Sequence, residues 1–327
     1  MNVRLSGRRP GRRLISTTAV AATTVLGLGA LTACGSSAAD SKNSDGKLDV
    51  VASFYPMQFL AERIGGDHVA VTNLTKPGQE PHDLEVSAQQ RAQLEEADAA
   101  VYLKGLQPAV DEAISQSGIS TKVDAASLTT LEEHGSEVGG HAEEHDGHDH
   151  GGEEGTDPHI WLDPVKYAEV AEGVGKALQK ADPDHAADYE KNTAALVKEL
   201  DQLNTTFEDG LKNTDSKVFI TTHAAFGYLA ERYGLTEEAI SGLDPESEPS
   251  ASRVKDLQEM AKADGVTTVF YETLVSDRTA KTLASDAKLT TAVLDPIEGI
   301  TDKSQGDDYL QVMKSNLAAL QKALGAK

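Results

Sequence analysis

Four short stretches of the sequence place a potential metal ligand where an apolar, strand-like run ends or a turn begins. The candidate ligands are His82, His159, His223 and Asp295. In open α/β sheets, ligands gather outside the carboxyl ends of the strands, so we expect two stretches from each half of the chain to face one cleft. Three imidazoles and one carboxylate form a four-coordinate set that suits Zn²⁺.

Each of these residues also has a simpler interpretation. A single histidine at a strand end more often forms a hydrogen bond within the fold, and an aspartate before proline, such as Asp295, is a common turn former. Glu80, two residues before His82, is a further candidate, either as a metal ligand, as a partner that orients an imidazole, or as a charged loop residue. Glu272 follows the apolar run 266–271 and is another candidate for the cleft, without an assigned role.

Cysteine content and charge narrow the chemistry. The 327 residues contain one cysteine, Cys34, which excludes an intramolecular disulfide and any multi-cysteine zinc or iron–sulfur site. Any metal must therefore be held by histidine and carboxylate. The chain has 30 Lys and Arg against 53 Asp and Glu, a net charge of −23. We expect no nucleic-acid partner, because a protein that binds the phosphate backbone needs the opposite sign of charge.

The order of apolar runs predicts two α/β lobes. In the first half, strand-length runs at 48–52, 69–74 and 99–103 alternate with helix-like segments at 57–64 and from about residue 87. The second half repeats the alternation, with strand-length runs at 218–220, 266–271 and 291–294 and helix-like segments at 224–233, from residue 276, and at 308–324.

A long amphipathic helix is predicted between the lobes. Asp182 and Pro183 supply an N-cap and a proline at the first helical position. Apolar residues then recur at three- and four-residue steps, namely Leu196, Leu200, Leu203, Phe207 and Leu211. A helix over 184–211 would extend about 42 Å. The predicted fold is therefore two α/β lobes joined by one long rigid helix, with the metal site in the cleft between the lobes.

The predicted domain boundaries follow from these elements. The N-terminal lobe is expected over 48–163, the linking helices over 164–212 and the C-terminal lobe over 213–327. Residues 132–155 contain seven Gly, nine acidic residues and five of the ten histidines, so they are expected to form a disordered loop. The loop histidines, which are expected to bind additional metal weakly, are His134, His141, His145, His148 and His150.

The N-terminus has the features of an export signal. Five Arg within residues 1–13 precede twenty uncharged residues, 14–33, and the segment reaches Cys34 through Leu31-Thr32-Ala33-Cys34. This pattern predicts a signal peptide over 1–33, and its ending resembles a bacterial lipobox. We therefore expect Cys34 to be lipidated, residues 34–47 to form a flexible tether, and the protein to be anchored to the outer face of the cell membrane. A retained membrane anchor is the alternative, and the choice between general and twin-arginine export stays open.

The motifs Glu80-Pro81-His82, DPHIWLDP at 157–164 and THAAFGY at 222–228 resemble those of the ZnuA/TroA-like metal-binding lipoproteins. These are the solute-binding proteins of zinc and manganese ABC transporters. The resemblance covers about residues 48–324 and implies the same two-lobed fold. It also implies that His82, His159, His223 and Asp295 are the metal ligands. Because zinc-type members commonly have histidine in the third position, His223 points to zinc.

The resemblance further implies a function in metal import. The expected protein is a monomer that captures Zn²⁺ as cargo and delivers it to the permease of an ABC importer, and it is not an enzyme. A manganese-preferring carrier of the same family is the first alternative. A secreted zinc hydrolase is the second, although the sequence has no His-Glu-x-x-His or Gly-x-Ser-x-Gly motif. An adhesin role, described for some family members, is not tested by the sequence.

Overall fold

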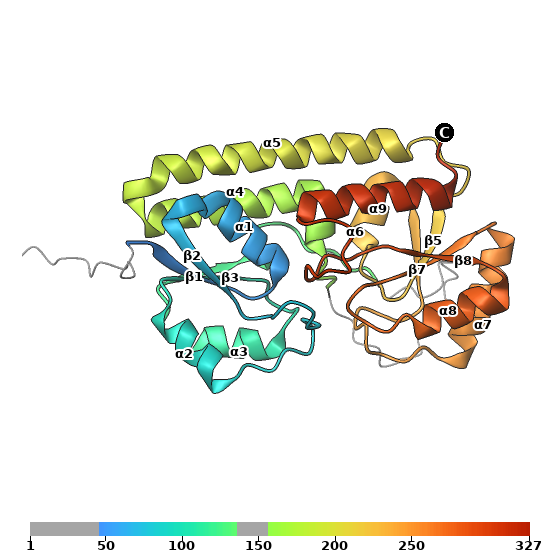
Figure 1. Cartoon of the computed structure of the whole chain (residues 1–327), viewed down its shortest axis with the longest axis horizontal. Helices are drawn as coiled ribbons and strands as arrows, with labels where there is room; N and C mark the ends of the chain where they lie inside the picture. The colour runs from blue at the N-terminus through green and yellow to red at the C-terminus, as the bar shows by residue number, and fades with distance from the viewer. Residues whose placement is uncertain (1–45, 136–155) are drawn as a thin grey trace, which may run out of the picture. The chain divides into compact units, whose positions relative to one another are not determined.

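Two parallel four-stranded sheets form the two lobes of the protein (Figure 1). The computed structural model describes residues 46–135 and 156–327. The first sheet has the order β2-β1-β3-β4 and consists of β1 (Leu48–Ala52), β2 (Val69–Asn73), β3 (Ala99–Tyr102) and β4 (Thr121–Asp124). The second repeats this arrangement as β6-β5-β7-β8, with β5 (Val218–Thr221), β6 (Thr236–Ala239), β7 (Thr268–Tyr271) and β8 (Thr290–Val293).

Helices cover both sheets, as the sequence predicts for α/β lobes. The first lobe contains α1 (Tyr55–Gly65), α2 (Ala88–Glu96) and α3 (Pro108–Gln116). The second contains α6 (Gly227–Tyr233), α7 (Ala251–Ala263), α8 (Arg278–Ala287) and α9 (Tyr309–Leu324). Polar side chains cap the N-termini of several of these helices. For example, Ser87 and Gln90 form a capping box at the start of α2, and the Asp308 side chain caps α9.

Two packed helices, α4 (Pro164–Ala181) and α5 (Ala186–Leu211), connect the lobes. The predicted long helix is confirmed, except that it begins at Ala186 after a short 3₁₀ turn, Pro183–His185. Asp182 does not cap this helix through its side chain, because that carboxylate accepts a hydrogen bond from Tyr189 Oη and lies 2.7 Å from His185 Nδ1. At 26 residues, α5 extends about 39 Å. It contacts α1 of the first lobe and both α6 and α9 of the second. In Figure 1 it runs alongside α4 and, at its carboxyl-terminal end, α9.

One hydrophobic core continues from lobe to lobe. It contains the predicted apolar face of α5 together with residues of both sheets, such as Val50 and Phe219. The neighbouring residues Val51 and Ile220 point to the opposite faces of their sheets, where they join two smaller clusters beneath the outer helices. Because the shared core holds the lobes and the linking helices together, it provides a rigid frame for the loops at the strand ends.

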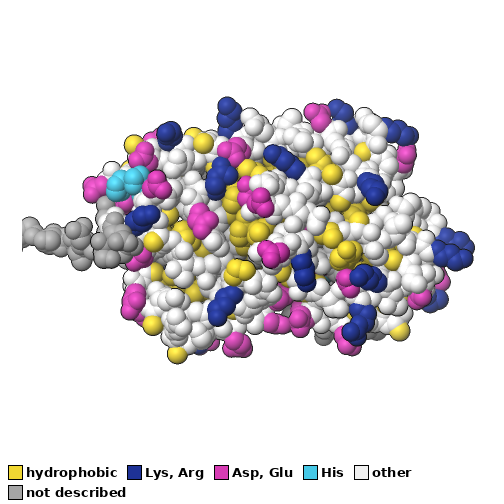
Figure 2. Space-filling view, viewed as in Figure 1, with side chains coloured by type: hydrophobic (Ala, Val, Ile, Leu, Met, Phe, Trp, Pro, Cys, Tyr) yellow, Lys and Arg dark blue, Asp and Glu magenta, His cyan; other side chains and the backbone are white. Residues whose placement is uncertain are grey.

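Surface and membrane features complete the description. On the face shown in Figure 2, lysine and arginine side chains alternate with acidic ones. Within residues 46–135 and 156–327, no helix is both long and apolar enough to cross a membrane. The predicted signal peptide, Cys34, most of the tether, and residues 136–155 of the predicted loop lie outside the described residues, as do His141, His145, His148 and His150.

Candidate metal centre

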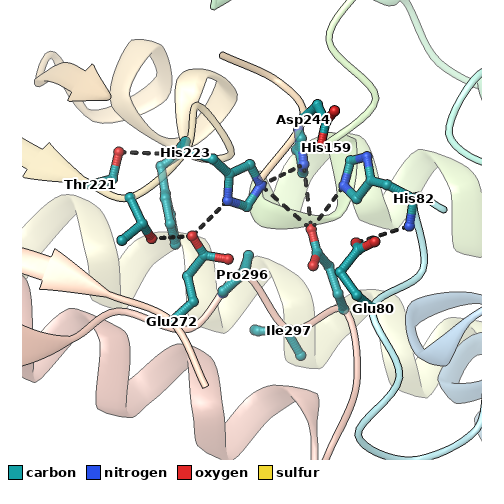
Figure 3. A network of polar contacts seen from close by, with 12 residues as sticks. Glu80, His82, His159, Thr221, His223, Asp244, Glu272, Pro296 and Ile297 are labelled. Carbon is teal, nitrogen blue, oxygen red and sulfur yellow. Dashed lines mark hydrogen bonds and ion pairs between the residues drawn. The ribbon is translucent and has the colours of Figure 1, made fainter. Parts of the chain in front are cut away.

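Three imidazoles surround one buried carboxylate between the lobes. In Figure 3, His82, His159 and His223 point toward a common centre. The carboxylate belongs to Glu298, whose Oε1 lies 3.2 Å from His82 Nε2, 3.5 Å from His159 Nε2 and 3.6 Å from His223 Nε2. His159 Nε2 and His223 Nε2 are 3.3 Å apart, and all four ligand atoms lie within 4.8 Å of one another.

These spacings fit a small tetrahedral ion. Zinc binds imidazole nitrogen and carboxylate oxygen at about 2.0–2.2 Å, so neighbouring ligand atoms of a tetrahedral shell are separated by roughly 3.3–3.5 Å. The four separations of 3.2–3.6 Å given above match that edge length. In addition, Glu298 Oε2 is buried without a hydrogen-bond partner among the described residues. The cluster therefore has the donor atoms and the size for one metal ion.

Each ligand comes from a segment that follows a strand. His82 lies in the loop after β2, and His159 lies after the long segment that follows β4, directly before the 3₁₀ turn Ile160–Leu162. His223 follows β5 by two residues, and Glu298 follows β8 by five. Two ligands thus come from each half of the chain. Within each half they lie close together, because parallel strands direct their carboxyl ends to the same edge of a sheet.

Two further carboxylates orient the buried imidazoles. Asp157 Oδ1 lies 2.7 Å from His159 Nδ1, and Glu272 Oε1 lies 2.6 Å from His223 Nδ1. A carboxylate at Nδ1 fixes the tautomer that leaves Nε2 free to coordinate metal. Glu272, for which the sequence indicated no role, therefore has a positioning role, and Thr222 also contacts its carboxylate.

Glu80 stabilises the loop that carries His82. Its carboxylate accepts hydrogen bonds from the backbone N–H groups of His82, at 2.9 Å, and Asp83, at 3.2 Å. It is not a member of the four-residue ligand cluster. Of the three roles considered from sequence, the structure favours a loop residue that fixes the backbone of a ligand.

Burial and charge oppose each other strongly at this centre. His159, His223 and Glu298 are fully buried, whereas the His82 side chain is 12% exposed. Burial alone would raise the pKa of Glu298, but contacts with His159, His223 and His82 hold it well below the usual value. Burial would likewise lower the pKa of His223, but Glu272 and Glu298 hold it well above 6.5. The pocket therefore stabilises positive charge next to Glu298.

The expectation that Asp295 is the fourth ligand is not met by this geometry. Asp295 Oδ1 accepts a hydrogen bond from the Ile297 N–H at 2.8 Å, and Oδ2 accepts one from Thr273 Oγ1 at 3.1 Å. Its carboxylate is thus used to fix the turn after β8. Glu298, three residues later, is the carboxylate in the cluster. The sequence signal that was missed is this second acid in the same strand-end loop.

The turn that brings Glu298 to the centre is held from both lobes. Ile297 has φ of +61°, a value that β-branched residues rarely adopt and that costs roughly 1–3 kcal/mol. Trp161 Nε1 donates a 2.6 Å hydrogen bond to the Pro296 carbonyl, and Tyr309 Oη donates to the Trp161 carbonyl. These buried contacts compensate for the strained backbone and fix the position of Glu298.

Comparison with known proteins identifies the family. The family model described as "Zinc-uptake complex component A periplasmic" (ZnuA) matches residues 50–323. The chain belongs to the ZnuA family. The high-affinity zinc uptake system protein ZnuA of Bacillus subtilis is 37% identical over 308 residues, which cover 90% of this chain and 94% of that protein. The zinc-binding lipoprotein AdcA of Streptococcus pneumoniae is 37% identical over 289 residues, and the chain spans only 56% of its length.

Solved structures of ZnuA-family proteins share this fold. The Zn(II)-bound ZnuA-like domain of S. pneumoniae AdcA has 33% sequence identity and a TM-score of 0.71, covering 85% of this chain and 99% of that domain. The laminin-binding protein Lmb of Streptococcus agalactiae, described as a bifunctional protein with adhesin and metal transporting activity, has 31% identity and a TM-score of 0.74, with the same coverage. The predicted family and two-lobed α/β fold are confirmed.

The buried Asp295 carboxylate makes stability depend on pH. Burial raises the pKa of Asp295 from 3.8 to about 6, against hydrogen bonds from Ile297 and Thr273 that lower it. Since the folded state holds this proton more tightly than the unfolded chain, stability is lost as pH rises through about 6. In metal-free protein, the free energy of unfolding of Asp295→Asn relative to that of the parent should therefore rise by roughly 2 kcal/mol when the pH is raised from 4.5 to 7.5. Urea unfolding at the two pH values measures this gain.

The matched control for that measurement is Asp256→Asn, which changes an exposed aspartate on α7. Its effect on the free energy of unfolding should be the same at both pH values. A pH-independent effect of Asp295→Asn as well would contradict the assignment of a raised pKa to Asp295.

Proposed function

We propose that this protein captures Zn²⁺ through His82, His159, His223 and Glu298 and delivers it to the permease of an ABC importer. The observation that carries this proposal is the set of 3.2–3.6 Å contacts between Glu298 Oε1 and the three imidazole nitrogens. The names of the relatives support zinc as the ion, since they include a zinc-binding lipoprotein and a zinc uptake system protein.

The donor set favours zinc over manganese. Imidazole suits zinc and other borderline metals, whereas Mn²⁺ prefers carboxylate, carbonyl and water oxygens. Three neutral imidazoles with one Glu298 carboxylate supply only one negative charge. A manganese-preferring site would be expected to contain more oxygen ligands. Competition between Zn²⁺ and Mn²⁺ for the site tests the alternative, a manganese-preferring carrier.

The same donor set argues for a carrier and against a hydrolase. Catalytic zinc sites keep one coordination position open for water, whereas a set of four protein ligands closes the shell. Glu298 occupies the position that a catalytic water would need. Turnover of a peptide or ester substrate by the zinc-loaded protein would favour the hydrolase instead.

Release is proposed to begin at the His82 loop. The core shared by both lobes opposes a large separation of the lobes, while His82 is the one ligand of the cluster with an exposed side-chain fraction. Beside its loop, a cavity of about 850 Å³ is lined by Pro77, Gly78 and residues 300–304 of the second lobe, among others. A permease that draws this loop away would remove one ligand and admit water to the ion.

Substitutions of the ligands test the site directly. His159→Ala should weaken zinc binding by at least about a hundredfold, since changing a group that only orients a ligand commonly costs 10–100-fold. Glu298→Gln should weaken it by at least about tenfold, because the amide carries no charge. Asp295→Asn is the matched control and should change affinity less than Glu298→Gln does, because the amide oxygen can still accept the hydrogen bond from the Ile297 N–H. Competition with a zinc chelator measures these affinities, and equal effects at positions 295 and 298 would contradict the proposed ligand set.

Zinc affinity should fall steeply on acidification. An imidazole must lose its proton to coordinate, and the pKa of His159 and that of His223 are both raised, with burial opposing but Asp157, Glu272 and Glu298 prevailing. Proton competition should thus begin above the ordinary histidine pKa of about 6.5. Titrations of the parent between about pH 8 and 6 should show a loss approaching a hundredfold per pH unit, the limit in which these two imidazoles must each release a proton. An affinity independent of pH would reject an imidazole-based site.

Anchoring through Cys34 is the second part of the proposed function. The lipobox-like ending at residues 31–34 and the name "lipoprotein" of the AdcA relative support it. Mass spectrometry of the membrane-associated protein should show a diacylated or triacylated Cys34 and no residues 1–33. Two or three acyl chains give stable anchoring, which one chain does not. Detection of an intact N-terminus on that protein would contradict lipidation at Cys34.

A further inference from the structure

A second group of potential metal ligands lies outside the centre between the lobes. Glu132, His134 and Glu231 each place one ligand atom within 4.8 Å of the others. His134 Nε2 is 2.9 Å from Glu231 Oε2. Glu231 is on α6, whereas the other two belong to the start of the acidic segment that was predicted to be a loose loop. The part of that segment within the described residues, 132–135, has defined contacts.

The backbone around this group is fixed by hydrogen bonds that are buried or partly buried. The Glu132 N–H donates to Tyr228 Oη at 2.8 Å, and the Glu132 carbonyl accepts from the Asp157 N–H at 2.9 Å. Tyr228 Oη in turn donates to the Asp157 carbonyl at 2.8 Å. Both arms of the acidic segment are therefore joined to each other and to α6 where the group lies.

The first residue of α6 leaves the space that His134 fills. A Cβ atom at Gly227 would lie 2.5 Å from His134 Cβ and 2.6 Å from its Cγ. Tyr228 packs edge-on against the same imidazole, with ring centroids 4.5 Å apart. The fold thus contains a cradle for this side chain, which is 18% exposed.

One buried carboxylate serves both histidine sites. Asp157 Oδ1 contacts His159 Nδ1 at 2.7 Å, and Asp157 Oδ2 contacts His134 Nδ1 at 3.0 Å. In each case the carboxylate holds Nδ1 and directs Nε2 toward another carboxylate, Glu298 or Glu231. Carboxylate–histidine–metal triads use this arrangement. His134 is therefore prepared for coordination in the same way as His159.

The group carries negative charge and is open to solvent. The Lys166 ammonium lies 2.6 Å from Glu132 Oε1 and compensates for one of the two carboxylates. Glu231 is 60% exposed, so an ion can reach it. His134 and Glu231 also line a cavity of about 290 Å³. One further positive charge is needed, either a proton on His134 or a bound cation.

We propose that Glu132, His134 and Glu231 form a second divalent-cation site, which shares Asp157 with the site between the lobes. One nitrogen and two oxygen ligands, with water completing the shell, suit zinc and related borderline ions. Because the site has fewer protein ligands and is more exposed, it binds zinc more weakly than the central site. This inference goes beyond the proposed function, since delivery of the central ion does not require it.

Zinc binding to the mature chain tests the proposal. His141, His145, His148 and His150 are replaced by alanine in every protein, so that they cannot contribute ligands. Equilibrium dialysis against zinc should then give two ions per chain, and crystals should show zinc-edge anomalous density beside His134 Nε2. His134→Ala and Glu231→Gln should each weaken the second ion at least about tenfold and leave the tight ion unchanged. Glu133→Gln, which changes an exposed neighbour outside the group, should retain both.

Each other outcome has a distinct meaning. A single zinc in the parent, or two in both His134→Ala and Glu231→Gln, would overturn the proposal. A single zinc in the parent, together with a loss of unfolding free energy in His134→Ala, would show that His134 is only a protonated partner of Asp157 and Glu231. Absence of the tight central ion from the parent, with the second ion still bound beside His134, would contradict the proposed function and leave this inference standing. Asp157→Asn should weaken both ions, because its carboxylate orients both histidines.

Discussion

The structure depends on a carboxylate buried among three imidazoles. Removing the Glu298 charge from water is costly, and only positive charge or a metal at its oxygen atoms can compensate for that cost. In the protein alone, contacts with the three histidines hold the pKa of Glu298 low, whereas Glu272 and Glu298 raise that of His223. A bound dication with three neutral imidazoles would satisfy the same carboxylate. Protons on the imidazoles and a bound metal ion are thus alternative ways to compensate for the buried Glu298 charge, and they compete with each other.

The fold positions these four side chains by repetition of one topology. Each lobe has the same parallel strand order, and each contributes two ligands from segments after its strands. The linking helices and the continuous core hold the lobes in register. Trp161 and Tyr309 extend this rigidity to the turn before Glu298. Asp157 and Glu272 then fix the imidazoles of His159 and His223. The site thus combines a rigid frame, two oriented imidazoles and one more exposed ligand, His82.

Much of this arrangement could be predicted from the sequence. Strong apolar runs identified β1, β5 and β7, and the periodicity of α5 identified the helix that contacts both lobes. The short strands β4 (TKVD) and β6 (TEEA) were missed because they contain few apolar residues and are stabilised by pairing with their neighbours. Local pattern cannot reveal strands whose stability comes from distant partners.

The ligand set was predictable only in part, for a related reason. The three histidines stand in distinctive motifs, and the structure brings them together. Asp295 and Glu298 occupy the same strand-end loop, and sequence alone does not show which carboxylate is used in the turn. That choice depends on Thr273 and on the positive φ of Ile297. His134 was assigned to a loose loop because its partners, Asp157 and Glu231, are 23 and 97 residues away along the chain.

The most direct test of the central claim is the zinc-edge anomalous structure of the protein loaded with one equivalent of Zn²⁺. We expect one ion bound by the Nε2 atoms of His82, His159 and His223 and by a Glu298 oxygen, at about 2.0–2.2 Å. An ion coordinated by Asp295 in place of Glu298, or found away from these histidines, would contradict the account.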